Sequence, residues 1–443
     1  VSPQMQARLG IRETRLPPNE LISALLQAPV DMLWNGGIGT YVKAAGETHD
    51  DVGDKSNDAV RIDSHQLQCG VLGEGGNLGF TQLARIGFAR TGGAANTDFI
   101  DNAGGVDCSD HEVNIKIMLN EIMDNGDLTR KQRNEVFMAQ TEAVGKLVLN
   151  NNYRQTQAIA LAYRDCKLRL DEYVRLMRDY ESQGKLNRSL EFLPSEDVLL
   201  DRRAQNQGLT RPELAVLISY TKADLKEQLN RPSITEDDYI SAIASPAFPA
   251  ELATRFAEPL TRHRLRREII ATQLANDMVN YMGITFVSRL GDSSGATVTD
   301  IARAYVTARD TFSLPEYWSK INALDYSVDT HIQEDMMAEL MRLVRRATRW
   351  FLRNRRVSVA IAAEVDQFRD AVRHIAAHLG ETLKGGALAR WQALYDKRRE
   401  AGVPADLAAF SAGAGELYAA LGIIEAAQQS KCDVHNVTEA YFG

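Results

Sequence analysis

The sequence predicts an α/β segment with a small parallel sheet, followed by a large all-α region, and two observations lead to this fold class. Within residues 71–112, short apolar runs end in glycine-rich turns and are followed by amphipathic stretches. This order of strand, glycine-rich turn and helix is typical of a parallel sheet that binds ligands beyond the carboxyl ends of its strands. After residue 126, apolar residues recur at helical spacing and alternating β-branched runs are few.

The first strand candidate, residues 30–34, follows a predicted helix whose apolar stripe covers residues 21–26. The strand runs into Asn35-Gly36-Gly37, the first of three glycine-rich turns. Residues 44–66 are polar and acidic, so we expect them to form a surface excursion before the second strand.

The second strand candidate, residues 71–72, runs into the turn at residues 73–77, and an amphipathic helix follows. The third, Phe99-Ile100, runs into Asn102-Ala103-Gly104-Gly105. Glycine at such turns allows a backbone to approach a ligand with no Cβ in the way. The three turns together therefore favour a ligand-binding rim over isolated structural turns.

The region after the third turn is predicted to be helical, and three capping boxes mark helix starts. Each box has the spacing Ser/Thr-x-x-Glu, at Ser109, Thr210 and Ser233. The other predicted helices cover residues 129–149, 156–180, 264–290, 297–311, 331–351, 359–378 and 387–399. A break is expected at the three asparagines 150–152.

Composition narrows the class of protein. The chain has 443 residues, 44% hydrophobic and 25% charged, which is the ordinary balance of a globular protein of two or three domains. A formal net charge of -8 argues against nucleic acid as the main partner. The four cysteines lie far apart, which favours reduced thiols in a cytoplasmic protein.

The sequence contains neither a membrane-spanning apolar run nor a signal-peptide pattern. No membrane partner is therefore expected. The chain begins at Val1 and stops after Tyr441-Phe442-Gly443, so both ends look cut from a longer protein.

Asparagines stand at each glycine-rich turn, at Asn35, Asn77 and Asn102. Their amides could bind ribose hydroxyls or a carboxamide, although turn chemistry alone also favours asparagine. A dinucleotide fingerprint is not present. The position three residues after the second glycine is Leu78 in one turn and Val42 in another, where the pattern requires glycine.

The cluster at residues 107–112 offers a thiol, an imidazole and carboxylates, but consecutive residues cannot all point at one ion. No metal site is therefore predicted. Cys108 has no identifiable base, which argues against a nucleophile. Ser109, at a predicted helix start, could hold an anion such as a carboxylate, or could serve only as the helix cap.

Seven arginines crowd residues 342–356, the strongest charge feature of the chain. One hypothesis is that these arginines bind a nucleic acid or another anionic partner. We favour a solvated helix face, or pairing with acidic surfaces elsewhere in a larger protein.

The stretches VDMLWNGGIGTYVK, VLGEGGNLGFTQLARIGFA and NTDFIDNAGGVDCSDHEVNIKIMLN closely resemble the large bacterial NAD-specific glutamate dehydrogenases. GLTRPELAVLISYTKADL and MGITFVSRL resemble the C-terminal region of the same family. The smaller hexameric glutamate dehydrogenases share a shorter pattern, whose counterparts here look like residues 35–37, 74–77 and 102–106. The first turn departs from that pattern, with Asn35-Gly36-Gly37 in place of proline-alanine-alanine.

This resemblance implies a cofactor, NAD, and a set of site residues. The residues implied to lie along the nicotinamide-ribose half of NAD are Asn35, Gly36, Gly37, Gly75, Gly76, Asn77 and Asn102. Val106 would contact the methylene chain of the substrate, and Ser109 would bind a substrate carboxylate.

The resemblance also implies a domain organisation. Residues 1–125 would form the second half of a Rossmann-type NAD-binding domain with the rim of the substrate cleft. Residues 126–443 would form a helical C-terminal domain. The glycine fingerprint and the catalytic lysine and aspartate of the family lie upstream and have no counterpart here, so no catalytic residue is assigned to this chain.

Two hypotheses for function follow. In the first, the chain is a part of an enzyme that converts L-glutamate, NAD and water into 2-oxoglutarate, ammonia and NADH, and it is inactive without the remainder of the parent chain. A homo-oligomer is expected. In the alternative, the chain is a helical scaffold for oligomerisation or regulation, with no chemistry of its own.

Overall fold

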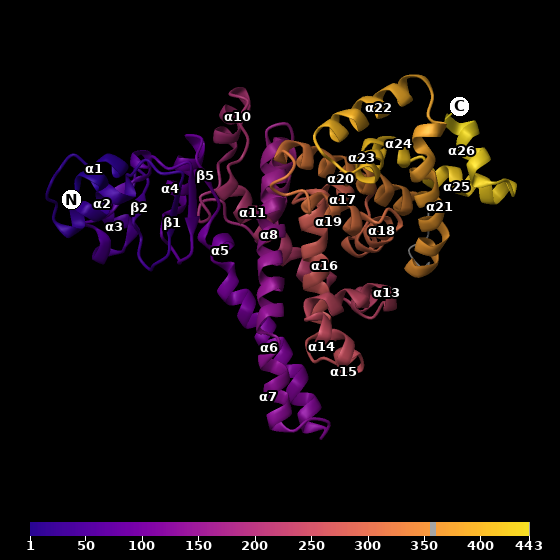
Figure 1. Cartoon of the computed structure of the whole chain (residues 1–443), viewed down its shortest axis with the longest axis horizontal. Coiled ribbons are helices and arrows are strands. Elements are labelled where there is room, and N and C mark those ends of the chain that lie inside the picture. Colours follow the sequence, from indigo (N-terminus) through magenta and orange to yellow (C-terminus); the bar gives the residue numbers. More distant parts are fainter. Residues whose placement is uncertain (355–359, 443) are drawn as a thin grey trace. The chain divides into compact units, whose positions relative to one another are not determined.

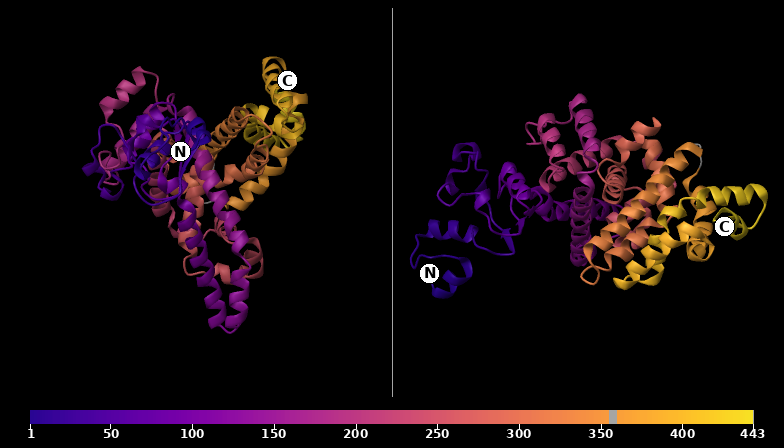
Figure 2. Two further views of the ribbon diagram at one scale, coloured as in Figure 1. Left: turned by 60° about the vertical axis from the view of Figure 1, so that its left-hand side comes forward. Right: turned by 90° about the horizontal axis from the view of Figure 1, so that it is seen from above.

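The computed structural model describes residues 1–354 and 360–442, and this described part is mainly helical with two small parallel sheets (Figure 1 and Figure 2). Its residues form two compact units, which we describe separately. The first comprises Val1–Asp224 and Ala244–Ile269, and the second comprises Leu225–Ile243 and Ile270–Gly443. The expected functional division between residues 125 and 126 stays a prediction.

Three short strands of the first unit form a parallel sheet in the order β1 (Met32–Asn35), β4 (Val71–Glu74), β5 (Ala94–Ala95). β1 pairs with β4 along its whole length, so that Asn35 lies opposite Glu74 at the carboxyl end. The first two predicted strands and the parallel arrangement are therefore confirmed.

The connection between β1 and β4 is only partly a surface excursion. It carries β2 (Val42–Lys43) and β3 (Ile62–Asp63), which pair in parallel. Residues 45–59 are mostly exposed, as predicted, but Val60 and Arg61 are buried. The predicted excursion is thus wrong for its last residues, because β3 adds Ile62 to the core.

One face of the three-stranded sheet is covered and the other is open, because alternate side chains of a strand point to opposite faces. The covered face contributes to a buried apolar cluster made of Val42, Ile62, Cys69, Leu72, Phe80, Ala84, Phe88 and Ala95. On the open face, Met32, Trp34 and Val71 are 50%, 56% and 43% exposed. The indole of Trp34 lies over Gly75, where a Cβ would approach the ring to 2.7 Å.

The helices of the first unit are α1 (Pro3–Leu9), α2 (Pro18–Leu26), α3 (His49–Val52), α4 (Gln82–Arg90), α5 (Asp98–Asp101), α6 (Ala103–Asp124), α7 (Arg130–Met138), α8 (Thr141–Cys166), α9 (Leu170–Ser182), α10 (Glu196–Ala204), α14 (Ala250–Arg255) and α15 (Ala257–Thr261). Two further helices, α11 (Arg211–Leu229) and α16 (Arg266–Met282), continue from one unit into the other. The predicted helix at 21–26 and the helix after the second turn are confirmed.

The third predicted strand, Phe99-Ile100, is wrong. These residues form the single helical turn α5, in which Ile100 is fully buried and Phe99 is 46% exposed. The third strand is β5, which lies earlier at Ala94–Ala95. A two-residue apolar run fits a strand and a helical turn equally well, and here the backbone N–H groups of Ile100 and Asp101 bond to Thr97.

The capping box predicted at Ser109 is also wrong. α6 begins at Ala103, directly after Asn102, so Ser109 lies in the second turn of the helix. Glu112 forms an ion pair with Lys116 one turn later instead of capping a helix. Residues three and four apart face the same side of any helix, so this spacing does not distinguish a helix start from a helix interior.

Of the other two predicted boxes, one has its glutamate contact. Thr210 donates from its backbone N–H to Glu213 Oε2 at 2.6 Å, directly before α11. At Ser233 the box is wrong, because the helix α12 (Pro232–Thr235) starts one residue before it.

The predicted break at residues 150–152 is wrong, since α8 runs through these asparagines. The interruptions fall instead at Ala139-Gln140 and at residues 167–169. Asparagine has a low helix propensity, but Ile159 and other buried residues of α8 pack against the core and override it.

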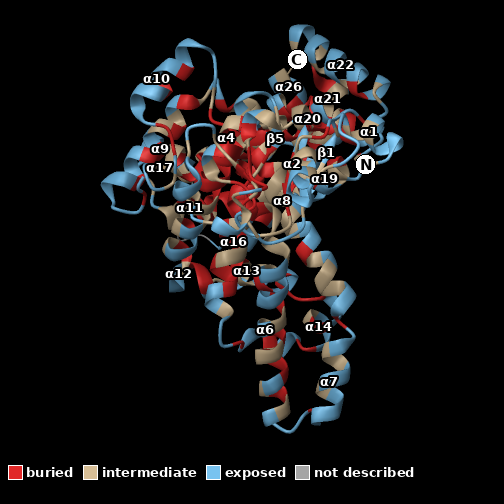
Figure 3. Cartoon of the chain, turned by 90° about the vertical axis from the view of Figure 1, so that its left-hand side faces the viewer, coloured by how far each residue is buried: buried red, intermediate tan, exposed pale blue. Residues whose placement is uncertain are grey.

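The second unit is all-helical among its described residues. Its helices are α12, α13 (Asp238–Ser241), α17 (Phe286–Ser294), α18 (Val298–Thr311), α19 (Leu314–Asn322), α20 (Thr330–Asn354), α21 (Ile361–Thr382), α22 (Gly385–Glu400), α23 (Ala405–Ala412), α24 (Ala414–Leu417), α25 (Ala420–Ser430) and α26 (Val434–Phe442). Large side chains such as Trp318, Tyr305 and Phe368 are fully buried among them. Figure 3 shows this pattern of burial along the helices.

The helices predicted at 297–311, 331–351 and 387–399 are confirmed, and the one at 359–378 is confirmed from Ile361, since residue 359 lies outside the described residues. The helix predicted at 264–290 is wrong in one respect. It divides at Gly283, whose φ of +89° ends α16.

The arginine run lies on α20, opposite buried Leu343 and Ala347. Arg342 pairs with Glu339, and Arg346 donates to the carbonyl of Gly415. These arginines therefore occupy the solvated side of an amphipathic helix, as we favoured. Arg355 and Arg356 of the run lie outside the described residues.

Candidate functional site

The first two glycine-rich turns lie against each other at the carboxyl ends of β1 and β4. The N–H of Gly75 donates to the carbonyl of Asn35 at 2.7 Å. A Cβ at Gly76 would overlap the carbonyl oxygen of Gly37, so only glycine permits this approach of the two backbones. We call these turns, with the third turn that joins them, the rim (residues 35–37, 74–79 and 98–102).

The third turn reaches the second through two asparagines. Asn102 donates from Nδ2 to Asn77 Oδ1 at 2.5 Å. Asn102 also stands at the N-cap position of α6. The sequence-predicted residues Asn35, Gly37, Gly76, Asn77 and Asn102 are thus brought into one continuous rim.

Asn35 has an unused hydrogen-bond donor. Its Nδ2 is buried and has no hydrogen-bond partner among the described residues. A Cβ at Gly79 would overlap the same atom, so the amide lies against the backbone of the second turn. Buried donors normally have partners, so this one is suited to donate to a ligand oxygen.

A buried charged cluster that includes two rim residues was not identified from the sequence. Glu74 accepts from Arg85 Nε at 2.6 Å and from Nη2 at 2.8 Å, and the two side chains are 2% and 4% exposed. Asp98 lies 3.3 Å from the same guanidinium. Burial raises the pKa of the Glu74 carboxyl, although its hydrogen bonds with Arg85 act in the opposite direction.

These carboxylates hold the backbone of the second turn. Asp98 accepts from the N–H of Leu78 at 2.8 Å, and Asp101 accepts from the N–H of Glu74 at 3.2 Å. Leu78 has a φ of +55°, a left-handed conformation that a leucine rarely adopts. Burial raises the pKa of Asp101 as well. The sequence did contain a signal for these carboxylates. Two aspartates three residues apart, at 98 and 101, are unusual on either side of a buried strand such as the one predicted at Phe99-Ile100.

Val106 and Ser109 follow Asn102 on α6 at spacings of four and three residues, so the three positions share one side of the helix. Val106 is 69% exposed and Ser109 is exposed. Because Ser109 is not at the helix N-terminus, the argument from free N–H groups and the helix dipole does not apply to it.

The cluster at residues 107–112 lies on the second and third turns of α6. Asp107 Oδ1 lies 3.7 Å from the ring of His111, and Asn151 donates to Asp107 at 2.9 Å. In the described part of the chain, no group of three or more His, Cys, Asp or Glu side chains is arranged to hold a metal ion. Cys108 is exposed on the surface of the helix.

The chain matches two protein-family models. Residues 1–162 match "Bacterial NAD-glutamate dehydrogenase, catalytic domain", and residues 206–443, more than half of the chain, match "Glutamate dehydrogenase, C-terminal". The chain belongs to the bacterial NAD-glutamate dehydrogenase family. The rim lies in the segment that matches the catalytic domain of this family.

Curated members of the family cover the whole chain. It is 55% identical over 442 residues to the NAD-specific glutamate dehydrogenase of Pseudomonas aeruginosa, and 50% identical to that of Halomonas elongata. The protein of the same name from Mycobacterium tuberculosis is 36% identical over 448 residues. The chain spans only 27–28% of the length of these relatives.

Across the described residues, no helix has both the length and the hydropathy that crossing a membrane requires.

Proposed function

We propose that this chain is part of an NAD-dependent glutamate dehydrogenase, which converts L-glutamate, NAD and water into 2-oxoglutarate, ammonia and NADH. The observation that carries the proposal is the rim, in which the glycine-rich turns after two parallel strands share one edge and Asn35 presents an unused donor. The names of the relatives support the choice of reaction and of NAD over other nucleotides.

β1, β4 and β5 are proposed to be the second half of a Rossmann-type NAD-binding domain. The parallel pairing supports this, since parallel sheets bind nucleotides beyond the carboxyl ends of their strands. The open face and the free edge of β1 are then places where the remainder of the parent chain would pack.

The residues proposed to contact NAD are those of the three turns: Asn35, Gly36, Gly37, Gly75, Gly76, Asn77 and Asn102. The residues present fit this role, because nothing lies within 4 Å of the position that a Cβ of Gly37 would take and the asparagine amides can bond to ribose hydroxyls or a carboxamide. When bound, NAD supplies the acceptor for the hydride from the substrate Cα. The rim of this chain orients the nicotinamide half of the cofactor.

Val106 and Ser109 are proposed to bind the substrate. Their place on the same side of α6 as Asn102 supports this, because a substrate beside the nicotinamide would lie along that side. Val106 would pack against the methylene groups and the Ser109 hydroxyl would donate to a carboxylate. The catalytic lysine and aspartate are proposed to come from another part of a longer, cytoplasmic, homo-oligomeric protein.

The test uses the longer protein that contains this chain. Asn35→Ala removes a donor that has no hydrogen-bond partner among the described residues, so it should leave folding intact and raise the KM for NAD about tenfold, the value of one lost hydrogen bond. The matched control is Asn436→Ala, which removes an exposed amide from α26. An unchanged KM in Asn35→Ala would contradict the proposed NAD contact.

A second measurement tests the incompleteness of the site. The 443-residue chain alone should show no glutamate-dependent reduction of NAD. Turnover by this chain alone would overturn the assignment of the catalytic pair to another segment. The alternative of a scaffold without chemistry gains no support from the family match, since the model over residues 1–162 describes a catalytic domain.

A further inference from the structure

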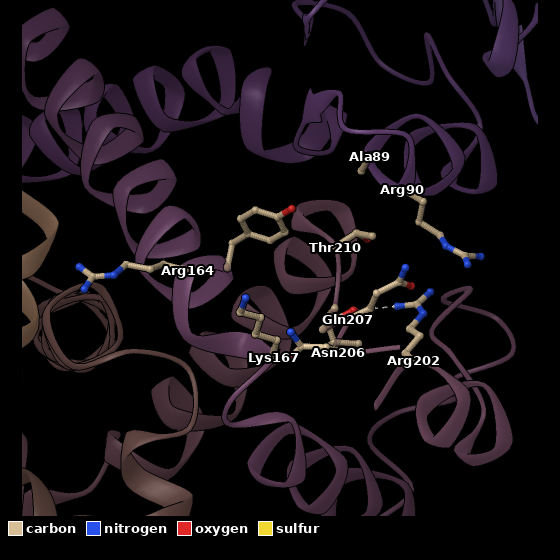
Figure 4. Close-up of a pocket in the computed structure, with 11 residues that line it drawn as sticks. Ala89, Arg90, Arg164, Lys167, Arg202, Asn206, Gln207 and Thr210 are labelled. Atoms are coloured by element: carbon tan, nitrogen blue, oxygen red, sulfur yellow. Dashed lines mark hydrogen bonds between the residues drawn. The ribbon is translucent and has the colours of Figure 1, made fainter. Parts of the chain in front are cut away.

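A separate pocket of about 340 Å³ lies in the first unit, and none of its lining residues belongs to the rim. Its walls come from the last turns of α4, α8 and α10 and from the loop at residues 206–210 that leads into α11 (Figure 4). This volume is within the range of pockets that hold small molecules.

The lining of this pocket is strongly basic. Of its eleven residues, four are arginine or lysine and none is aspartate or glutamate. Arg90 and Lys167 form no ion pair with any described residue, and both are exposed at the pocket. Figure 4 shows the Arg164 side chain extending away from the other labelled residues, so it is not part of the cationic group.

Arg202 forms the buried end of this group. Its side chain is held by Glu213 through two hydrogen bonds of 2.8 Å, and the residue is only 6% exposed. Its Nε is nevertheless buried without a hydrogen-bond partner among the described residues. A buried arginine with a spare donor, in a pocket without carboxylates, is suited to an anion.

The wall opposite α4 is fixed in shape. Arg202 also donates to the carbonyl of Gly208 at 3.4 Å, and the N–H of Leu209 donates to Cys166 Sγ at 3.2 Å. Gly208 packs so closely that a Cβ there would lie 2.9 Å from the backbone nitrogen of Lys167. The loop that offers the side-chain amides of residues 206 and 207 is therefore held before any ligand binds, which lowers the entropy that binding must overcome.

We propose that this pocket binds a small organic or inorganic dianion, with Arg90 and Lys167 as its charged contacts and Arg202 at its base. Two cations that form no ion pair in the described part of the chain match two negative charges better than one, and the volume accommodates a phosphate ester or a short dicarboxylate. The ligand could carry its two negative charges on a phosphoryl group or on two carboxylates, and the experiment below distinguishes these two classes.

The experiment is a ligand-observed NMR titration of the 443-residue chain, without NAD, with inorganic phosphate and separately with succinate. Acetate at matched ionic strength is the monovalent control. We expect saturable binding of at least one dianion, weakened on the order of tenfold in Lys167→Met and in Arg90→Gln. Both substituted side chains are exposed, so the variants should fold as the parent chain does.

The matched control variant is Lys131→Met, which removes an exposed lysine of α7 outside the pocket and should leave the affinity unchanged. Saturation by phosphate alone assigns the site to a phosphoryl ligand, and saturation by succinate alone assigns it to a dicarboxylate. No saturation by either, or equal affinities in Lys167→Met and Lys131→Met, overturns the proposal. The result does not depend on the NAD and glutamate contacts proposed above.

Discussion

The loops of the α/β segment (residues 1–102) and the helices of the second unit hold their backbones in different ways. In the loops, aspartate carboxylates bond to backbone N–H groups of a neighbouring turn, as Asp98 does with Leu78 and Asp101 with Glu74. In the helices, the backbone bonds to itself, and buried apolar side chains such as Leu340 join neighbouring elements.

This difference predicts how each region responds to substitution. The shape of the rim depends on a few polar contacts, each with one specific partner, and an unpaired member of such a network is costly when buried. The helical core depends on the sum of many weak apolar contacts, which any large-to-small substitution reduces. The following predictions test this contrast, from the largest expected effect to the smallest.

Glu74→Ala should lower the free energy of unfolding by about 3–5 kcal/mol, because it removes the carboxylate to which buried Arg85 donates twice and leaves only Asp98, at 3.3 Å, beside the guanidinium. Urea unfolding followed by circular dichroism measures this. The control is Glu142→Ala, which breaks the exposed pair with Lys146 and should cost less than about 1 kcal/mol. Equal losses in the two variants would remove the special role given to the buried pair.

Leu340→Ala should destabilise the helical core by about 2–5 kcal/mol, through lost burial and the cavity left behind. Leu394→Ala, at a leucine that is 37% exposed, serves as the matched control and should cost clearly less. The same unfolding experiment applies. A loss below about 1 kcal/mol for Leu340→Ala would show that this core does not depend on tight packing.

Asp98→Ala should cost about 1–3 kcal/mol, the value of a charge-assisted hydrogen bond, here the partly buried one from the N–H of Leu78. The clearest effect should be local. The amide hydrogen of Leu78 should exchange faster, because the left-handed backbone at this residue loses its hydrogen bond to Asp98. Hydrogen exchange followed by NMR measures this. In Asp50→Ala, which changes an exposed aspartate of α3, exchange at Leu78 should stay as it is. Unchanged protection in Asp98→Ala would contradict the anchoring role.

Lys222, on helix α11, is a polar side chain whose pKa is shifted by its surroundings, as are the carboxyls of the rim residues Glu74 and Asp101. Burial, together with nearby Arg154, lowers the pKa of this lysine to about 7, and its amine donates to Gln155 at 2.8 Å. At pH values between this lowered pKa and the ordinary pKa of lysine, the side chain is mostly deprotonated in the folded state and protonated in the unfolded state. The folded state therefore binds fewer protons in this pH range. The stability of the parent chain should therefore rise with pH through this window.

Lys222→Met should lack this rise. Its stability relative to the parent chain should fall by on the order of 1 kcal/mol between about pH 6 and pH 8. Lys226→Met, which changes an exposed lysine of the same helix, should show no such pH dependence. Parallel pH profiles for Lys222→Met and the parent chain would contradict the lowered pKa.

Part of the rim could be predicted from the sequence, and part could not. The glycine turns and the asparagines at 35, 77 and 102 could be named because each follows an apolar run in a recognisable local order. The cluster of Glu74, Arg85 and Asp98 could not, because its successive members are 11 and 13 residues apart in no known spacing and meet only in the fold. The roles of the rim residues toward NAD stay predictions.

The sequence by itself determined the long amphipathic helices, the first two strands, and the family, because each of these depends on patterns within a short stretch or on extended motifs. Only the tertiary structure decided that Phe99-Ile100 is helical, that α6 begins at Ala103, and that α8 passes through three asparagines. Local propensity differs by less than about 1 kcal/mol between such alternatives, and the burial of one side chain such as Ile100 outweighs it.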